Sequence, residues 1–282
     1  MNKKKIFLTI DFEDWKYDTS VSYSILKNNK INKKLLLKTY FNIQDFIDKN
    51  LNGDKITFFC TGILASKFPQ IIEEINNNGH EIACHYYNHK NITDDTLNNF
   101  EYNLLKSKEK FENITNKPLK GFRAPKFSIY HSHRDYLKIV SNIFKYDSSL
   151  NLNSIKDLNK ISCEDIDINF FPVFTSKFFF NILKYKPGGT YMKLFPYRIL
   201  YNNILETFNK NAKPIIYLHP YEFLQNKEFA FNYEELKHKN FLFSLYFMLR
   251  QNQWNSGNSF ILKKLKKIFN VYESGGKLEN LI

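Results

Sequence analysis

The sequence predicts an α/β fold in which parallel strands are covered by helices. Short apolar runs of four or five residues alternate with longer segments whose apolar residues recur at helical spacing. This alternation is typical of βαβ units, so the strands should pair in parallel, in an open sheet or a barrel. Polar side chains follow several of the runs, and such folds place their chemistry at the carboxyl ends of the strands.

Five segments are predicted as strands, each followed by polar or turn residues. They cover residues 6–10, 56–60, 81–84, 121–124 and 214–218. Helices are expected over residues 35–47, 68–77, 97–111 and 135–143, where apolar side chains fall on one helical face. Gly79 gives the second helix a C-terminal stop. No Pro/Gly/Ser-rich linker divides the chain, so we expect a single domain over residues 1–282.

The composition indicates a sizeable core and a basic surface. Hydrophobic residues make up 43% of the chain and aromatic residues 17%. The formal net charge of +13 suits an anionic partner such as phosphate, a diphosphate lipid, nucleic acid or a membrane. Compositional drift toward lysine is the alternative. No nucleic-acid-binding module is recognisable, so we expect no nucleic acid partner.

The cysteines and the first residues bear on the cellular compartment. Cys60, Cys84 and Cys163 are odd in number and lack CxxC spacing, which argues against a disulfide framework and a thiolate metal site. The opening MNKKKIFLTIDFEDW contains too short an apolar run for a signal peptide. We therefore expect a cytoplasmic protein that contacts the inner face of the membrane at most peripherally.

His85 and His89 are candidate metal ligands. Their spacing of four residues places both imidazoles on one face if this segment forms a helical turn. Two histidines and one carboxylate are a common catalytic metal set, which leaves a coordination position open for water or substrate. The alternative is a pair of histidines satisfied by ordinary hydrogen bonds.

Three carboxylates within four residues follow the first predicted strand. Asp11, Glu13 and Asp14 would repel one another there unless a cation or an arginine neutralises them. Asp11 and Glu13 share a face along a strand, so one could bind metal while the other takes a proton from bound water. Asp14 competes with Glu13 for the ligand position. A solvated turn or a helix N-cap is the alternative for the whole cluster.

Two further polar residues follow predicted strands. Arg123 lies in GFRAPKF, where Pro125 restricts the turn and the guanidinium could hold a carboxylate through its planar fork. His219 in YLHPYE is placed to protonate a leaving amine. Standing alone, the first would be a surface salt-bridge arginine and the second a satisfied core histidine.

From Leu8 to about Glu222 the chain resembles the polysaccharide deacetylase (NodB-homology) superfamily, whose members remove N-acetyl or O-acetyl groups from sugars. The ordered motifs are LTIDFEDW, GHEIACHYYNH, GFRAPKF, YDSS and YLHPYE. PGGTYMKLFPYRIL and YLHPYEF further resemble a bacterial subgroup associated with exopolysaccharide and surface-glycan synthesis. The resemblance implies one catalytic domain with a distorted (β/α) barrel of parallel strands, fewer than eight.

The resemblance also implies a metal centre. His85 and His89 would bind one divalent ion, with Glu13 or Asp14 as the third ligand. The ion would be Zn²⁺, with Co²⁺, Fe²⁺ or Ni²⁺ as alternatives. Most relatives carry adjacent aspartates followed by glycine where this chain has DFED, so the ligand carboxylate stays open. Cys84 replaces the asparagine or serine of many relatives, as a small buried filler or a redox-sensitive thiol.

The remaining roles follow from the same motifs. Asp11 would be the general base, and Arg123 would orient it. The backbone N–H of Lys126 would help hold the oxyanion, and His219 would be the general acid. His80, in the same motif as the ligand histidines, is expected to be structural.

The implied function is metal-dependent removal of an acetyl group from an N-acetylated sugar, less often an O-acetylated one, during surface-glycan synthesis. The sugar could be lipid-linked, nucleotide-linked or soluble. One alternative is an enzyme of the same fold that cleaves a non-sugar C–N bond, such as a cyclic imide or ureide. Another is a catalytically silent glycan- or lipid-binding protein. Five aromatic residues could line a sugar groove or belong to the core: Phe171, Phe174, Tyr185, Tyr191 and Tyr221.

A basic helical extension is expected from about residue 241. Within it, residues 261–269 are predicted to form an amphipathic helix that carries Lys263, Lys264, Lys266 and Lys267. This helix could meet anionic lipid or pack on the barrel with a solvated outer face. We favour packing.

Overall fold

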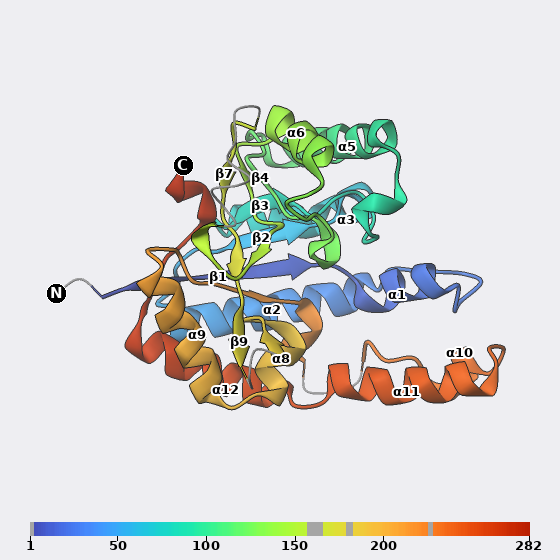
Figure 1. Cartoon of the computed structure of the whole chain (residues 1–282). Helices are drawn as coiled ribbons and strands as arrows, with labels where there is room; N and C mark the ends of the chain where they lie inside the picture. Colours follow the sequence, from blue (N-terminus) through green and yellow to red (C-terminus); the bar gives the residue numbers. More distant parts are fainter. Residues whose placement is uncertain (1–2, 157–165, 179–182, 225–227) are drawn as a thin grey trace.

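Parallel strands form the centre of the computed structural model, which describes residues 3–156, 166–178, 183–224 and 228–282 (Figure 1). Seven strands follow one another in the order β11, β1, β2, β3, β4, β5 and β7, and every adjacent pair is parallel. No pairing within the described ranges joins β7 to β11. The prediction of parallel strands, fewer than eight, is confirmed as an open half-barrel. Cys163 lies outside the described residues.

The strands of the half-barrel are short, and β1 is the longest of them. Their bounds are β1 (Lys5–Phe12), β2 (Thr57–Cys60), β3 (Glu81–Cys84), β4 (Gly121–Phe122), β5 (Tyr146–Asp147), β7 (Asn169–Phe170) and β11 (Ile215–Leu218). Smaller pairings join β6 (Asn151–Leu152) to β8 (Val173–Phe174), β9 (Ser176–Phe178) to β10 (Leu183–Tyr185), and β12 (Glu273–Ser274) to β1.

Helices cover the outside of the half-barrel. Figure 1 shows α3, α5 and α6 gathered over one part of the sheet and α2, α9 and α12 over the other. The covering helices are α2 (Lys33–Asn50), α3 (Gly62–Lys67), α4 (Pro69–Asn77), α5 (Leu97–Thr115), α6 (Arg134–Ile143), α8 (Gly189–Leu194), α9 (Tyr197–Asn209) and α12 (Asn258–Val271). The remaining helices, α1 (Trp15–Tyr23), α10 (Tyr233–Leu236) and α11 (Phe241–Asn255), extend away from the sheet.

The predicted elements lie where the sequence places them, with shifted ends. The helix predicted over residues 97–111 continues to Thr115, and the first strand continues to Phe12. The strand predicted over residues 121–124 is shorter, because β4 ends at Phe122. Hydrophobic spacing locates the middle of an element, whereas its ends depend on caps and on partner strands.

The side chains of each strand alternate between two cores. On β1 the even-numbered residues Ile6, Leu8 and Ile10 face the helices, and Phe7 faces the inside of the half-barrel. The interior cluster also takes alternate residues from the neighbouring strands, among them Phe59, Ala83, Ile215 and Tyr217. Odd-numbered positions on β1, β2, β3 and β11 therefore point inward, and the same alternation carries the residues that follow each strand.

The basic helix predicted over residues 261–269 lies within α12 and packs on the half-barrel. Ile261, Leu265 and Ile268 are buried, and the Lys264 ammonium donates to two backbone carbonyls of the segment at α8. The favoured packing arrangement is the one observed. Within the described ranges, none of the helices combines the length and the apolarity required to cross a membrane.

A buried carboxylate holds the amino end of the sheet together. The side chain of Glu81 accepts hydrogen bonds from Thr57 Oγ1 at 2.5 Å, from Tyr146 Oη at 2.7 Å and from the Glu279 backbone N–H at 3.0 Å. These contacts join β2, β3 and β5 to the C-terminal turn η4 (Leu278–Leu281). Burial raises the pKa of Glu81 to about 7, against the opposing effect of its donors.

Glu81→Gln should flatten the pH dependence of stability. The raised pKa means that folded Glu81 binds its proton more tightly than unfolded Glu81. The free energy of unfolding of the wild-type protein should therefore fall as the pH rises from about 4.5 to about 7, by an amount on the order of 3 kcal/mol from this group. The amide cannot titrate, so that fall should shrink in the variant.

Chemical denaturation at several pH values would measure the change, with the exposed Glu73→Gln as the matched control. Equal pH slopes for the wild type and Glu81→Gln would contradict the prediction.

Candidate metal centre

The candidate residues meet at the carboxyl ends of the inner strands. Asp11 is an inward position at the end of β1, and His85, Arg123 and His219 each directly follow a strand, namely β3, β4 and β11. Their odd numbers continue the inward alternation of these strands. Side chains that lie far apart in the sequence therefore converge inside one mouth of the half-barrel, as the alternating fold predicted.

Glu13, His85 and His89 form a triad that could hold a metal ion. Their ligand atoms all lie within 4.8 Å of one another. Glu13 Oε2 is 2.6 Å from His89 Nε2 and 3.9 Å from His85 Nε2. Glu13 and His85 are buried, and His89 is partly exposed, so one side of the triad stays open toward solvent. A catalytic metal site requires buried protein ligands on one side and an open coordination position for water or substrate on the other.

The donor atoms of the triad fit a cation. His85 Nδ1 lies 2.8 Å from the backbone carbonyl of Arg123, which only a protonated nitrogen can satisfy, so Nε2 carries the free lone pair. Glu13 Oε2 is buried without a properly directed hydrogen bond, despite the short distance to His89. A buried carboxylate oxygen that lacks a hydrogen-bond donor and lies close to two imidazole nitrogens has the position expected of a metal ligand.

The electrostatic environment supports the same protonation states. Burial raises the pKa of Glu13, but His89, His219 and His85 outweigh it and lower that pKa to about 2. Burial lowers the pKa of His85 to about 4. An ionised carboxylate and a neutral imidazole are the forms that bind metal.

Asp14 is occupied elsewhere. Its Oδ1 accepts from the Tyr17 backbone N–H at 2.9 Å as the N-cap of α1, and its Oδ2 accepts from the Asn32 backbone N–H at 2.8 Å. The geometry thus separates two carboxylates that the sequence left as rivals. Glu13 joins the histidines, and Asp14 starts the helix.

The helical turn expected around the two histidines is absent. Residues 85 and 86 have no regular structure, residues 87–90 form bends, and Tyr86 adopts the left-handed conformation with φ of 64°. The prediction of a shared helical face was therefore wrong, although the imidazole centroids still lie 5.4 Å apart. The sharp backbone turn at Tyr86 achieves the convergence instead, because it redirects the chain directly after His85.

Arg123 holds Asp11 inside the half-barrel. Arg123 Nη1 donates to Asp11 Oδ1 at 2.7 Å and to Thr9 Oγ1 at 2.8 Å, and Nη2 donates to Ser148 Oγ at 2.8 Å. The guanidinium also lies 4.0 Å from the ring centroid of Phe59. The contact with Asp11 is a single bond rather than the anticipated planar fork, because Ser148 takes the second arm.

Lys126 occupies a strained turn beside the triad. It belongs to the turn η2 (Pro125–Phe127), has φ of 55°, and lines the same cavity as Glu13 and His89. Its backbone N–H donates to no other described residue. A non-glycine residue at positive φ costs free energy and is concentrated at functional sites, where the surrounding structure holds it in place.

His219 lines the same cavity as Glu13 and His89 and has a partner that the sequence reasoning missed. Glu222, in the turn η3 (Pro220–Phe223), is fully buried, and its Oε2 lies 3.5 Å from His219 Nδ1 and accepts from the His219 backbone N–H at 2.9 Å. Burial lowers the pKa of His219, but Glu222, Glu13 and Asp11 outweigh it and raise that pKa to about 9. The available signal was the spacing in HPYE, because Pro220 starts a turn that returns Glu222 to His219.

His80 and Cys84 lie outside the site. His80 Nδ1 accepts from the Ile56 backbone N–H and Nε2 contacts Gln44 Oε1, so both ring nitrogens are satisfied. Cys84 points to the helix-facing core, where burial raises the pKa of its thiol to about 12. The geometry agrees with a structural histidine and a buried filler.

A cavity of about 230 Å³ opens beside the triad. Its lining residues come from the residue after β1, from α1, from the bends after β3, from η2, from η3 and the residue before it, and from α11: Glu13, Trp15, Asp18, Thr19, Ser22, Tyr23, His89, Lys126, His219, Tyr221 and Trp254. Of the five aromatics expected in a groove, only Tyr221 is among these lining residues. Phe174 and Tyr185 are buried in the core instead.

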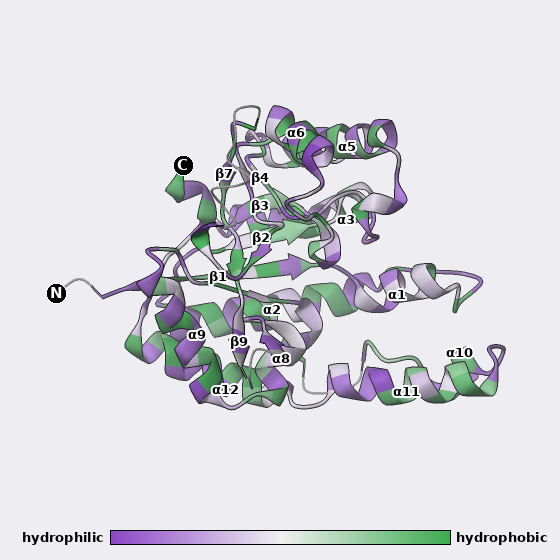
Figure 2. Ribbon diagram, in the orientation of Figure 1, coloured by the Kyte–Doolittle hydropathy of each residue, from purple (hydrophilic) through white to green (hydrophobic). Residues whose placement is uncertain are grey.

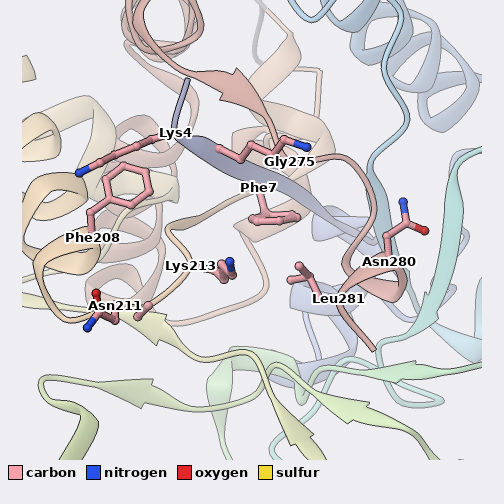
Figure 3. A pocket seen from close by; sticks show the side chains of 10 residues that line it. Lys4, Phe7, Phe208, Asn211, Lys213, Gly275, Asn280 and Leu281 are labelled. Atoms are coloured by element: carbon pink, nitrogen blue, oxygen red, sulfur yellow. The ribbon is translucent and has the colours of Figure 1, made fainter. Parts of the chain in front are cut away.

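A larger cavity, of about 690 Å³, lies at the amino end of β1 (Figure 3). Lys4, Phe7, Phe208 and Lys213 line it, together with the C-terminal segment around Leu281. None of the candidate site residues takes part in it. The candidate site residues gather instead at the smaller cavity, at the opposite end of the strands.

The comparisons with known proteins agree with this arrangement. The family model described as polysaccharide deacetylase matches residues 1–141, which is half of the chain. The chain belongs to the polysaccharide deacetylase family. The sequence resemblance is thereby confirmed, and the matched half contains the triad, Asp11 and Arg123.

Two curated relatives of this deacetylase family member are bacterial. It is 35% identical over 97 residues to the peptidoglycan-N-acetylglucosamine deacetylase of Bacillus cereus, a match that covers 34% of this chain and 32% of the relative. It is 33% identical over 94 residues to the peptidoglycan deacetylase of Helicobacter pylori, covering 33% and 31%. The matches thus span about a third of the length of these relatives.

Solved structures share the fold of this family member. A candidate polysaccharide deacetylase from Mycobacterium smegmatis aligns with a TM-score of 0.54 at 17% identity, over 97% of this chain and 94% of the other. A CE4 family pseudoenzyme from Bacillus anthracis aligns with a TM-score of 0.50 at 14% identity, over 99% and 66%. Because the fold accommodates a pseudoenzyme as well, activity has to be argued from the site residues.

The assignment of Glu13, rather than Asp14, as the carboxylate of the triad can be tested with a matched pair of variants. Glu13→Gln should weaken Zn²⁺ binding by at least about a hundredfold, since loss of an outer-shell partner alone typically costs roughly 10–100-fold. Asp14→Ala should leave the affinity unchanged and lower the free energy of unfolding by about 1 kcal/mol, because α1 loses its N-cap.

Calorimetric titration of Zn²⁺ into chelator-treated protein measures the first effect, and thermal unfolding measures the second. Retained affinity in Glu13→Gln together with lost affinity in Asp14→Ala would reverse the assignment.

Proposed function

We propose that this protein is a metal-dependent hydrolase that removes the acetyl group from an N-acetylated sugar. The observation that carries the proposal is the convergence of the Glu13, His85 and His89 triad with the pair of Asp11 and Arg123 and with His219, at the carboxyl ends of the strands. Each chemical role that amide hydrolysis requires has a residue of suitable type there.

Glu13, His85 and His89 would hold the metal ion, as one carboxylate and two neutral imidazoles. A divalent ion such as Zn²⁺, when bound, polarises the acyl carbonyl and lowers the pKa of water.

Asp11 is the base in this proposal. Its carboxylate is buried and held in one orientation by Arg123, so it can take the proton of the attacking water without reorienting. The water oxygen forms a bond to the acyl carbon, and the carbonyl oxygen becomes an oxyanion. The free backbone N–H of Lys126, in its strained turn, is the donor offered to that oxyanion.

His219 is the acid. Glu222, Glu13 and Asp11 raise its pKa to about 9, so the imidazole carries a proton near neutral pH. It gives that proton to the sugar nitrogen as the C–N bond breaks. The products are acetate and a free amine. Asp11 then releases its proton to solvent and His219 takes up a proton from solvent, which returns the site to its starting state.

Two observations support a sugar over a cyclic imide or ureide. Trp15, Tyr23, Tyr221 and Trp254 contribute aromatic surface to the cavity beside the triad, which suits the apolar faces of a sugar ring. The Bacillus cereus relative is named for peptidoglycan N-acetylglucosamine. We propose an acetylated glycan or its lipid-linked or nucleotide-linked precursor as the substrate.

Acetate release from a panel of substrates tests the proposal. Chelator-treated protein should release no acetate, and added Zn²⁺ should restore release from at least one N-acetylated sugar, with Asp11→Asn as the inactive control. Release of ammonia or urea from a ureide, with no acetate from any sugar, would instead favour the non-sugar reaction. Metal binding without any release would overturn the hydrolase proposal.

Glu222→Gln should shift the alkaline limb of the pH–rate profile to lower pH. Glu222 is the first contributor that raises the pKa of His219, and glutamine keeps the acceptor for the His219 backbone N–H while removing the charge. The protonated acid is then lost at lower pH than in the wild type. The profile of kcat/KM against pH measures the shift, with the exposed Glu234→Gln as control. An unmoved alkaline limb would show that Glu222 does not govern the acid.

A further inference from the structure

Two long segments form an arm beyond the carboxyl ends of the strands. The arm consists of residues 15–31, which include α1, and residues 229–257, which include α10 and α11 (Figure 1). It has an apolar cluster of its own, made by Ile25, Phe231, Leu236 and Phe247. The segments thus pack on each other through this cluster, while Ile31 and Phe229 at their ends join the core of the half-barrel.

Helix α11 has apolar residues on its outer side as well as on its buried side, where Phe247 joins the apolar cluster of the arm. Its buried side includes the polar residues Ser244, Gln251 and Asn255, whose side chains bond to backbone groups. Its outer side carries five large apolar residues with exposed fractions of 73%, 76%, 48%, 59% and 64%, namely Phe241, Leu242, Leu245, Tyr246 and Leu249. In Figure 2 the half of α11 that lies farther from the half-barrel is coloured as hydrophobic over much of its length.

An outward row of this kind requires a partner. At 100° per residue the five side chains fall within one continuous arc of the helix, so they form a contiguous patch rather than scattered exposure. Contiguous apolar patches on a protein surface mark interaction sites, whereas single exposed apolar residues are ordinary.

The charges around the patch indicate what the partner is. The glutamates of the arm, Glu234 and Glu235, pair with Lys237 and Lys16. Lys239, just before α11, and Arg250, within it, have no carboxylate partner in the described part of the chain, and neither do Lys27 and Lys30 in the loop after α1. The whole chain adds a formal net charge of +13. An apolar row with Lys239 and Arg250 at its two ends is complementary to a surface of apolar chains and anionic groups.

A second copy of the chain fits the patch poorly. A twofold dimer places the same surface on itself, so the unpaired cations of one arm would face those of the other. A lipid surface with anionic headgroups meets both features at once. We propose that the outer face of α11 docks on such a membrane surface.

Docking in this way would hold the metal centre near the lipid. Trp15 and Tyr23 belong to the arm and line the cavity beside the triad, and Trp254 joins them from the end of α11, 4.9 Å from the Trp15 ring centroid. The arm therefore connects the membrane-facing helix to the cavity through packed aromatic rings. If the proposed function holds, this placement favours acetylated glycans that are carried at the membrane as the substrates of the enzyme.

Vesicle co-sedimentation of the full chain tests the docking surface without any assay of activity. The protein should sediment with vesicles of phosphatidylcholine that contain phosphatidylglycerol, less so with phosphatidylcholine alone, and binding should weaken as salt rises. Leu242→Glu/Leu245→Glu/Leu249→Glu should bind at least about tenfold more weakly. Tyr102→Glu/Leu105→Glu, which changes exposed apolar residues on α5, is the matched control and should bind as the wild type does.

Three outcomes would overturn the proposal. The first is no binding of the wild type to anionic vesicles at low salt, and the second is an equal loss of vesicle binding in the α11 variant and the α5 variant. The third is a wild-type protein that is dimeric and an α11 variant that is monomeric, with neither of them binding vesicles. The single variant Leu242→Ala, with a smaller loss expected, serves if the triple variant does not fold. Acetate release from a soluble acetylated sugar should be the same in wild type and variants. A membrane-binding protein without that release would leave docking intact and contradict only the proposed hydrolysis.

Discussion

The buried guanidinium of Arg123 is the interaction on which the arrangement of the candidate site depends. It follows β4, bonds to Thr9 and Asp11 of β1 and to Ser148 after β5, and lies over the ring of Phe59 on β2. Strands distant in the sheet order are thus fixed relative to one another by one charged side chain. Removing it would leave the Asp11 carboxylate buried and unpaired, which is strongly unfavourable. The site and the mouth of the half-barrel are therefore stabilised by the same contacts.

The two ends of the half-barrel use buried carboxylates in different ways. At the amino end Glu81 is satisfied by three donors, and its oxygens are enclosed by β2, β5 and the C-terminal turn. At the carboxyl end Glu13 Oε2 has no directed hydrogen bond and faces two imidazoles. A carboxylate with all its donors supports the fold, whereas one that lacks them is available for a ligand. The contrast within a single sheet distinguishes the chemical end from the structural end.

The arm extends this logic from the site to its surroundings. Helix α11 buries three polar side chains beside Phe247 and exposes leucines and aromatics on its outer side, and such a contiguous apolar patch is typical of an interaction surface. The same helix ends at Trp254, which lines the cavity beside the triad. The proposed docking surface and the cavity beside the triad are therefore joined by one helix.

The sequence by itself determined the parallel α/β fold and the set of residues that converge. The apolar runs are local, so they already placed Asp11, Arg123 and His219 at the carboxyl ends of their predicted strands. The choice between Glu13 and Asp14 depended on α1, because the helix start takes the Asp14 carboxylate as its cap. Three further features were not predicted from the sequence: the turn at Tyr86, the pairing of Glu222 with His219 and the outward apolar face of α11. Each depends on contacts between segments that are distant in the sequence, and only the tertiary structure decides those contacts.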